Sequence, residues 1–256
     1  NREECAFCFE SDLWPLYFSE TTVVLHRVFR QSDVEYIQIL QQIREGRIRK
    51  KDHEFLMKYV NRPYESTLFI EPTRLYPTKS KVLQLNMNKL NGLCGDVHEF
   101  QLESFTHMEM TKKEQIRRQQ FTDKDVEHEL TLLANNLICE TCIHLKSGAQ
   151  VMCIVNIKNA LTEDILLCNG SQGIVTHFCP LTGAPSVKFL NGVERVMTPH
   201  VWTSETIPGV GVSQVPLILA WGLTIHKCQG ATLEVAEIDV GSNIFEVGQT
   251  YVALSR

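Results

Sequence analysis

The pattern of apolar and polar positions divides the chain into a helix-rich first part and a strand-rich later part. In the first part, an apolar stripe begins directly after Asp33, a residue type that suits a helix N-cap. Gly46 follows the stripe, and glycine tolerates the left-handed conformation that ends many helices. The spacing therefore predicts one helix between these two residues, with an apolar stripe formed by Val34, Ile37, Leu40 and Ile43.

Weaker patterns predict further elements in the first half of the chain. We expect strands over Thr21–Leu25 and Thr67–Ile70, and helices over Asp52–Val60 and Lys81–Leu93. Residues 103–130 are polar and densely charged. For that segment we expect an exposed helix or a mobile connection that stays outside the core.

Short strands and tight turns dominate the sequence after Leu145. Residues Ala149–Val155 alternate in the manner of a strand. The pairs Asn169-Gly170 and Asn191-Gly192 favour tight turns, and the second pair joins two apolar runs into a hairpin. Several strands in so short a segment predict a small barrel or sandwich. Strand and helix signals alternate again after Pro216, so the simplest organisation is a β module inserted into an α/β domain.

The composition is that of a globular protein. The 256 residues are 43% hydrophobic and 21% charged, which suffices for a core. No apolar run approaches the roughly 20 residues that cross a bilayer, so we expect no membrane protein. The net charge of −5 disfavours nucleic-acid binding through overall charge, but it allows a local basic groove.

Nine cysteines are many for this length, and their odd number argues against a closed set of disulfides. Cys5 with Cys8, and Cys139 with Cys142, have the spacing of zinc-ligand pairs. The two pairs lie far apart along the sequence, and the second pair sits in an apolar stretch. We therefore interpret them as reduced, mostly buried thiols and expect no metal site.

The clearest chemistry lies between Pro216 and Arg256. An apolar strand leads into a polar turn, a second strand follows, and we expect the final arginine to open a helix or lie early in one. Polar side chains at the carboxyl end of a strand suit contact with phosphates. The residues of interest in the turn are Thr224, His226, Lys227, Gln229 and Gly230.

A phosphate-binding loop of the form Gly-x-x-x-x-Gly-Lys-Ser/Thr is absent from the sequence, in which no glycine directly precedes a lysine. That loop supplies the lysine and the hydroxyl that hold nucleotide phosphates and Mg²⁺. These residues therefore cannot hydrolyse ATP by P-loop chemistry on their own.

Residues Ala220–Leu233 and Gly248–Arg256 closely resemble motifs V and VI of superfamily 1B DNA helicases. The resemblance is best to the petite-integration-frequency (PIF) family. Val28–Asp33 together with Ile43–Gly46 looks like motif IV of that family. The motifs occur in the family's order.

Other segments extend the resemblance over about residues 20–100 and 145–256. Thr73–Thr78 with Asn86 matches the segment after motif IV, and Leu145–Met152 with Asn169–Val175 resembles the start of the family's inserted β-barrel. The resemblance implies a RecA-like motor domain, of the P-loop NTPase fold without its own P-loop, interrupted by an SH3-like β-barrel. The implied division is 1–146 for the first part of the motor domain, 147–205 for the barrel and 206–256 for the second part.

The same resemblance implies a function. The chain would be the C-terminal portion of an ATP-dependent helicase that moves 5′ to 3′ along single-stranded DNA and unwinds duplex or forked DNA. ATP and Mg²⁺ would be bound mainly by an N-terminal P-loop motor domain of the same protein, so this portion alone is expected to be inactive. The implied settings are DNA replication, repair, recombination and telomere maintenance. They place the protein in the nucleus or mitochondrion of a eukaryote, or otherwise in the cytoplasm.

Two arginines are the catalytic candidates by similarity to motifs VI and IV, namely Arg256 and Arg30. A guanidinium that reaches the γ-phosphate from a facing domain stabilises the charge of the transition state, typically by about 10³–10⁵ in rate. A lysine would lack the planar fork of donors.

The polar turn supplies the remaining candidates. We expect Thr224, His226 and Lys227 to contact the DNA strand, because all three can donate hydrogen bonds to phosphate oxygens. We place Gly230 and Gln229 at the nucleotide, although the sequence alone leaves open whether Gln229 faces ATP or DNA.

Two other functions remain open at this point. The chain could be a non-catalytic or decayed helicase-derived module that holds nucleic acid or a protein partner. It could also belong to an RNA-directed motor, because contacts to phosphates carry no information about the sugar unless a 2′-hydroxyl is read.

Overall fold

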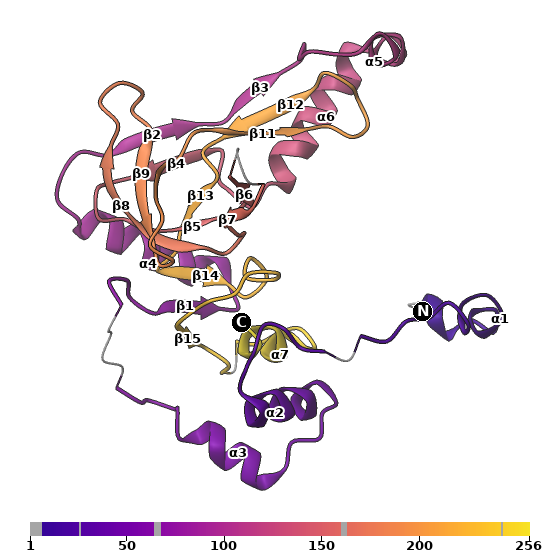
Figure 1. The fold of residues 1–256 in the computed structure, drawn as a ribbon, viewed down its shortest axis with the longest axis vertical. Coiled ribbons are helices and arrows are strands. Elements are labelled where there is room, and N and C mark those ends of the chain that lie inside the picture. Colours follow the sequence, from indigo (N-terminus) through magenta and orange to yellow (C-terminus); the bar gives the residue numbers. More distant parts are fainter. Residues whose placement is uncertain (1–6, 26, 64–67, 160–162, 242) are drawn as a thin grey trace.

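The computed structural model describes residues 7–25, 27–63, 68–159, 163–241 and 243–256. The chain has a mixed α/β fold, with one small parallel sheet and several antiparallel sheets. Figure 1 shows a β-rich part that stands above the parallel sheet, with the helices α7, α2 and α3 below. Within the described residues, no helix has the combined length and hydropathy of a membrane span.

The parallel sheet has the strand order β14-β1-β15. These strands span Gly222–Thr224, Thr73–Tyr76 and Ala236–Ile238. The predicted strand at Thr67–Ile70 is wrong: residues 68–70 form a bend, and Thr67 lies outside the described residues. The true strand falls between Pro72 and Pro77, where every residue keeps the N–H that a central strand needs on both sides.

Helix α4 (Lys79–Gly92) covers this sheet and confirms the predicted helix at 81–93. The buried side chain of Asn86 bonds to both backbone groups of Gly222, donating to its oxygen over 3.0 Å and accepting from its nitrogen over 2.8 Å. The amide therefore clamps β14 to the helix.

Helix α2 (Val34–Arg44) confirms the stripe seen in the sequence. The Asp33 carboxylate accepts a hydrogen bond from the Tyr36 backbone N–H over 3.0 Å, and Gly46 takes a positive φ of 69° after the last turn. Helix α3 (Lys50–Met57) replaces the predicted 52–60 with a shift of bounds. The N-terminal elements before them are η1 (Cys8–Glu10) and α1 (Trp14–Phe18).

The predicted strand at Thr21–Leu25 is wrong. Residues 22–25 have no regular structure, and the side chains of Val23, Val24 and Leu25 are exposed. A β-prone run forms a stable strand only where another strand offers its backbone groups, and none pairs with this segment in the described structure.

The largest sheet is antiparallel, with the order β10-β9-β8-β5-β13. The predicted hairpin at Asn191-Gly192 is confirmed, since it joins β9 to β10. In this sheet β10 and β13 are the two ends, so the described strands form an open sheet and not a closed barrel. In chain order its strands are Gln150–Cys153 (β5), Gln172–Phe178 (β8), Pro185–Phe189 (β9), Glu194–Val196 (β10) and Leu217–Leu219 (β13).

The apolar run after Pro216 was predicted to be one strand, but it forms two. Its first half, β13, pairs with β5 of the antiparallel sheet, and its second half, β14, joins the parallel sheet. Buried side chains hold the chain where it passes from the antiparallel sheet to the parallel sheet. The Gln150 amide donates to the Ala220 oxygen over 3.1 Å, and the Thr73 hydroxyl donates to the same oxygen over 2.7 Å.

The charged segment 103–130 is only partly as predicted. It contains the helices α5 (Lys112–Arg118) and the start of α6 (Asp123–Asn136), each begun by a capping box at Thr111 and Thr122. However, Val126 is buried against Ile207 and Val210, so this part of the chain does contribute to a small core.

Short strands complete the β-rich part. Strand β3 (Glu103–Phe105) pairs with β12 (Gly211–Gln214), which also pairs with β11 (His200–Thr203). Strand β2 (His98–Gln101) pairs with β4 (Cys142–Leu145), and β6 (Ile157–Lys158) pairs with β7 (Ile165–Leu167).

Candidate functional site

The polar turn after β14 is the centre of the site. Ile225 and Cys228 are buried and anchor it, while His226 and Gln229 are exposed. The Thr224 hydroxyl accepts a hydrogen bond from the Lys227 backbone N–H over 3.2 Å, which fixes the start of the turn.

Thr224 itself is only 4% exposed. Its oxygen serves the fold in this structure, and a contact between Thr224 and DNA stays a prediction. Gly230 is exposed and has a φ of +91°, a conformation that glycine adopts without strain.

The two predicted catalytic arginines meet at this turn, although they come from opposite ends of the chain. Arg256 donates from Nη1 to the Cys228 carbonyl over 3.4 Å. Arg30 donates from Nη2 to the Gly230 carbonyl over 3.5 Å and from Nε to the Thr232 hydroxyl over 3.2 Å. Both guanidinium groups therefore lie against residues 228–232.

The electrostatics of this pair are unfavourable without an anion. Burial lowers the pKa of Arg256, and the positive charge of Arg30 lowers that pKa further. Within the described residues, neither arginine forms an ion pair with a carboxylate. Two guanidinium groups that share only neutral acceptors suit a multiply charged anion such as a phosphate.

The prediction that Arg256 opens a helix or lies early in one is wrong. Helix α7 spans Gln249–Leu254, and Arg256 follows the C-cap residue Ser255. Gly248 is the N-cap of this helix and has a φ of +80°, and the Arg256 Nε turns back to donate to the Val252 oxygen over 2.8 Å. The arginine is thus held by the last turn of the helix.

Tyr36 is a residue of this site that was not singled out from the sequence. Its hydroxyl donates a hydrogen bond to the Leu254 carbonyl over 2.6 Å, and burial raises the pKa of Tyr36. A hydroxyl on an otherwise apolar helix face was the signal available in the sequence.

A cavity of about 550 Å³ opens on the polar turn. Four of the predicted site residues line it, whereas Gly230, Arg30 and Arg256 do not. The rest of its wall comes from segments that the sequence reasoning did not single out, including Lys79 and Phe245. The lining residues are Pro77, Thr78, Lys79, Leu137, Ile138, Thr224, His226, Lys227, Gln229 and Phe245.

Lys227 and Lys79 give this cavity its positive charge. Burial lowers the pKa of Lys227; Glu140 opposes that shift, and Lys79 adds to it. Lys79 occupies the first turn of α4, where the helix dipole disfavours a cation. His226 places its ring 6.1 Å from that of Phe245. The cavity thus combines cations with an aromatic wall, which suits a nucleic-acid strand.

Comparison with known proteins identifies similar helicases. Residues 127–178 match the family model of the 2B domain of DNA helicase Pif1. The ATP-dependent DNA helicase PIF1 of Danio rerio is 35% identical over 258 residues, which cover 100% of this chain and 36% of that protein. The chain therefore spans about a third of the length of this curated relative.

Solved structures give the same result. The crystal structure of Pif1 helicase from Candida albicans is 32% identical with a TM-score of 0.66, covering 98% of this chain and 57% of that one. The Bacteroides Pif1 structure in complex with ADP-AlF3 and single-stranded DNA is 26% identical with a TM-score of 0.52, covering 91% and 49%. The resemblance seen in the sequence is confirmed, and the chain belongs to the Pif1 family of DNA helicases.

Proposed function

We propose that this chain is the C-terminal motor portion of an ATP-dependent DNA helicase that moves 5′ to 3′ along one strand and unwinds duplex or forked DNA. The observation that carries the proposal is that one turn both lines the charged cavity and contacts the two arginines. Residues 226, 227 and 229 line the charged cavity, while the carbonyls of Cys228 and Gly230 accept from the two arginines. We therefore expect a change at one set of residues to affect the other.

The arginines fit the phosphates of ATP held by a separate P-loop domain. Arg256 and Arg30 would approach the γ-phosphate and stabilise its charge during hydrolysis, by about 4–7 kcal/mol if they act like other arginine fingers. No group of three metal-ligating side chains lies beside them in the part of the chain that the structure describes. Mg²⁺ would therefore be held by the P-loop domain, which supplies its usual ligands.

The cavity fits the DNA strand. His226 and Lys227 would donate to phosphate oxygens, and Phe245 would contact a base or sugar. The position of Gln229 in the same cavity supports a role at DNA and separates it from the arginines. Gly230 stays with the nucleotide side, because its carbonyl accepts from Arg30.

The same proposal covers the domains. Residues 1–146 and 206–256 would form a RecA-like domain around the sheet β14-β1-β15, and 147–205 would form an inserted β module built on the open antiparallel sheet. Among the described strands, two pairings cross this division: β12 pairs with β11, and β13, at 217–219, pairs with β5 of the inserted module. The pairing of β13 with β5 would let the module follow movements of the turn.

The test uses a longer protein in which this chain follows its P-loop domain. Arg256→Ala should lower DNA-stimulated ATP turnover at least tenfold while ATP still binds, and Arg256→Lys should restore little of it. Turnover near that of the unchanged protein in Arg256→Ala would remove the arginine from the reaction. Strand binding without any turnover in the unchanged protein would favour the non-catalytic module.

A further inference from the structure

Strands β2 and β4 place four polar side chains on one face of a two-stranded ribbon. In their antiparallel register Glu99 lies opposite His144, and Gln101 lies opposite Cys142. Alternate residues of a strand point to the same side, so these four share one face. The intervening residue Ile143 points the other way and is only 4% exposed.

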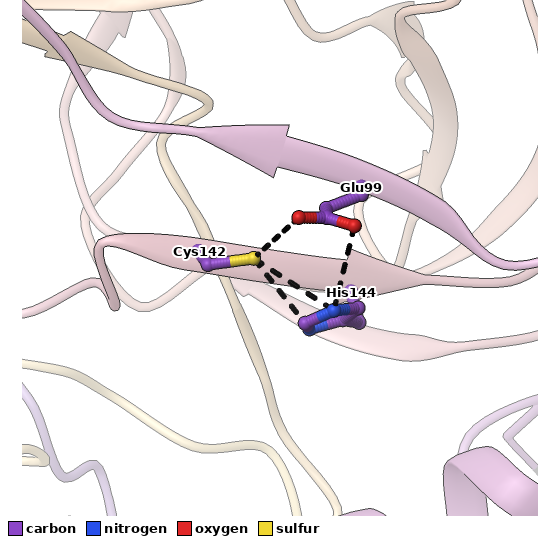
Figure 2. Close-up of side chains that lie close together, drawn as sticks. All are labelled: Glu99, Cys142 and His144. Carbon is purple, nitrogen blue, oxygen red and sulfur yellow. Dashed lines mark hydrogen bonds and ion pairs between the residues drawn. The ribbon is translucent and has the colours of Figure 1, made fainter.

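Three of these side chains turn toward one another. The Cys142 sulfur lies 3.3 Å from Glu99 Oε1 and 3.7 Å from His144 Nε2, and that nitrogen lies 4.0 Å from Glu99 Oε2. Figure 2 shows the sulfur, the imidazole and the carboxylate close together, with dashed lines that join each group to the other two. Their ligand atoms all lie within 4.8 Å of one another.

This triangle has nearly the size that a tetrahedral zinc ion requires. Zinc binds sulfur at about 2.3 Å, imidazole nitrogen at about 2.0–2.1 Å and carboxylate oxygen at about 2.0–2.2 Å. Ligand atoms around one such ion therefore stand about 3.4–3.6 Å apart. Adjustments of a few tenths of an ångström in exposed side chains would bring the three atoms to these separations.

We propose that Glu99, Cys142 and His144 bind a zinc-class divalent cation, with water in the fourth position. The donor set excludes Mg²⁺ and Ca²⁺, which prefer oxygen ligands, and favours ions that accept thiolate and imidazole. Gln101 supports the site from outside, because its Nε2 lies 3.2 Å from the Cys142 sulfur and also bonds to Glu99. Binding releases the proton of the thiol.

The site has a mechanical consequence. Strands β2 and β4 flank residues 102–141, which include β3, α5 and α6. An ion bound across the ribbon would tie both ends of that segment together. Cys139, the other half of the Cys-x-x-Cys pair, is buried and takes no part in the cluster.

The test titrates the metal-free chain with Co²⁺, which reports a tetrahedral site by visible bands and a bound thiolate by near-ultraviolet absorption. We expect one saturating equivalent with both features, displaced by Zn²⁺. Zn²⁺ at about 100 times its dissociation constant should raise the Tm by roughly 5–10 °C.

Variants assign the ligands. Cys142→Ser should remove the thiolate absorption, and His144→Gln and Glu99→Gln should each weaken binding at least tenfold. Cys179→Ser and His177→Gln alter another cysteine and another histidine that lie two positions apart in the sequence, and they should leave the titration unchanged. Circular dichroism checks folding, and if Cys142→Ser fails to fold, the other two variants decide. Absence of saturable binding, or an unchanged titration in His144→Gln and Glu99→Gln, overturns the proposal.

Discussion

The hydroxyl of Tyr36 donates a 2.6 Å hydrogen bond to the carbonyl oxygen of Leu254. Tyr36 lies in the first turn of α2, shortly after Arg30, and Leu254 is the last residue of α7, shortly before Arg256. The bond therefore joins the two segments that carry the arginines. We expect it to help set where those arginines stand relative to each other, although the described hydrogen bonds of the two guanidinium groups do not include Tyr36.

Removing only this hydroxyl should affect turnover more than ATP affinity. In the longer protein, Tyr36→Phe should cost about 0.5–1.5 kcal/mol of stability. It should lower kcat several-fold with little change in the KM for ATP, because the P-loop domain holds most of the nucleotide. Urea unfolding measures the loss of stability, and steady-state ATPase assays measure kcat and the KM for ATP.

Tyr59→Phe is the matched control, since Tyr59 is 53% exposed and does not appear among the described hydrogen bonds of Arg30 and Arg256. This variant should leave the free energy of unfolding and kcat unchanged. If Tyr36→Phe loses stability while kcat stays constant, the bond supports the fold but does not position the arginines.

Local signals in the sequence were reliable where one short segment determines the structure. The Asp33 cap, the stop at Gly46 and the Asn191-Gly192 hairpin depend only on neighbouring residues, and all three are confirmed. The meeting of Arg30 with Arg256 at one turn agrees with the motif order, yet no spacing within the sequence could have given the distance.

Elements that depend on distant partners were predicted poorly. Strand β1 is short and lies between prolines, and it exists because β14 and β15 pair with both of its edges. The run 217–224 reads as one apolar strand, but its halves find different partner sheets. Lys79 was missed for the same reason, because only the fold brings the start of α4 to the polar turn.

Lys227 should contribute one cation to strand binding. Lys227→Met should weaken binding of single-stranded DNA and reduce the slope of log affinity against log salt by about 0.7–1. Fluorescence anisotropy at several salt concentrations measures this. Lys188→Met is the control, because Lys188 lies on β9 and does not line the cavity. An unchanged slope in Lys227→Met would place the strand elsewhere.

The lowered pKa of Lys227 predicts that DNA affinity and stability depend on pH. Burial lowers the pKa of Lys227 below its ordinary value of about 10.5. Binding needs the charged form, so affinity for DNA should fall as the pH rises toward that value, and Lys227→Arg should delay the fall. The unfolded chain binds this proton more tightly than the folded chain. The contribution of Lys227 to stability without DNA therefore rises with pH between the lowered pKa and about 10.5.

Arg30 and Arg256 should act as a unit in turnover. We expect Arg30→Ala to lower DNA-stimulated ATPase at least tenfold, and the double alanine variant to lose much less than the product of the two single losses. The reason is that both would stabilise one developing charge, and groups that act together are not additive. A double-mutant cycle on kcat tests this, and strictly multiplicative losses would show that the two arginines act independently.

Gly170 should couple the β module to the polar turn. It has a φ of +101°, and a Cβ added there would lie 2.9 Å from the Ala231 Cβ and 3.0 Å from the Ala231 Cα. Gly170→Ala therefore forces a backbone that alanine rarely adopts and pushes the segment that accepts from Arg30. We expect a loss of about 2–4 kcal/mol, from about 1–2 kcal/mol of backbone strain and a similar steric term, together with a fall in kcat.

Gly192→Ala separates the effect of backbone strain from the effect of the contact with Ala231. Gly192 has a φ of +84° in the β9–β10 hairpin, but nothing lies within 4 Å of its added Cβ. That variant should lose only the strain term, about 1–2 kcal/mol, and keep its kcat. Thermal unfolding and ATPase assays on both variants in the longer protein make the comparison. Equal losses of stability with unchanged kcat in both would show that the contact between Gly170 and Ala231 transmits nothing to the arginines.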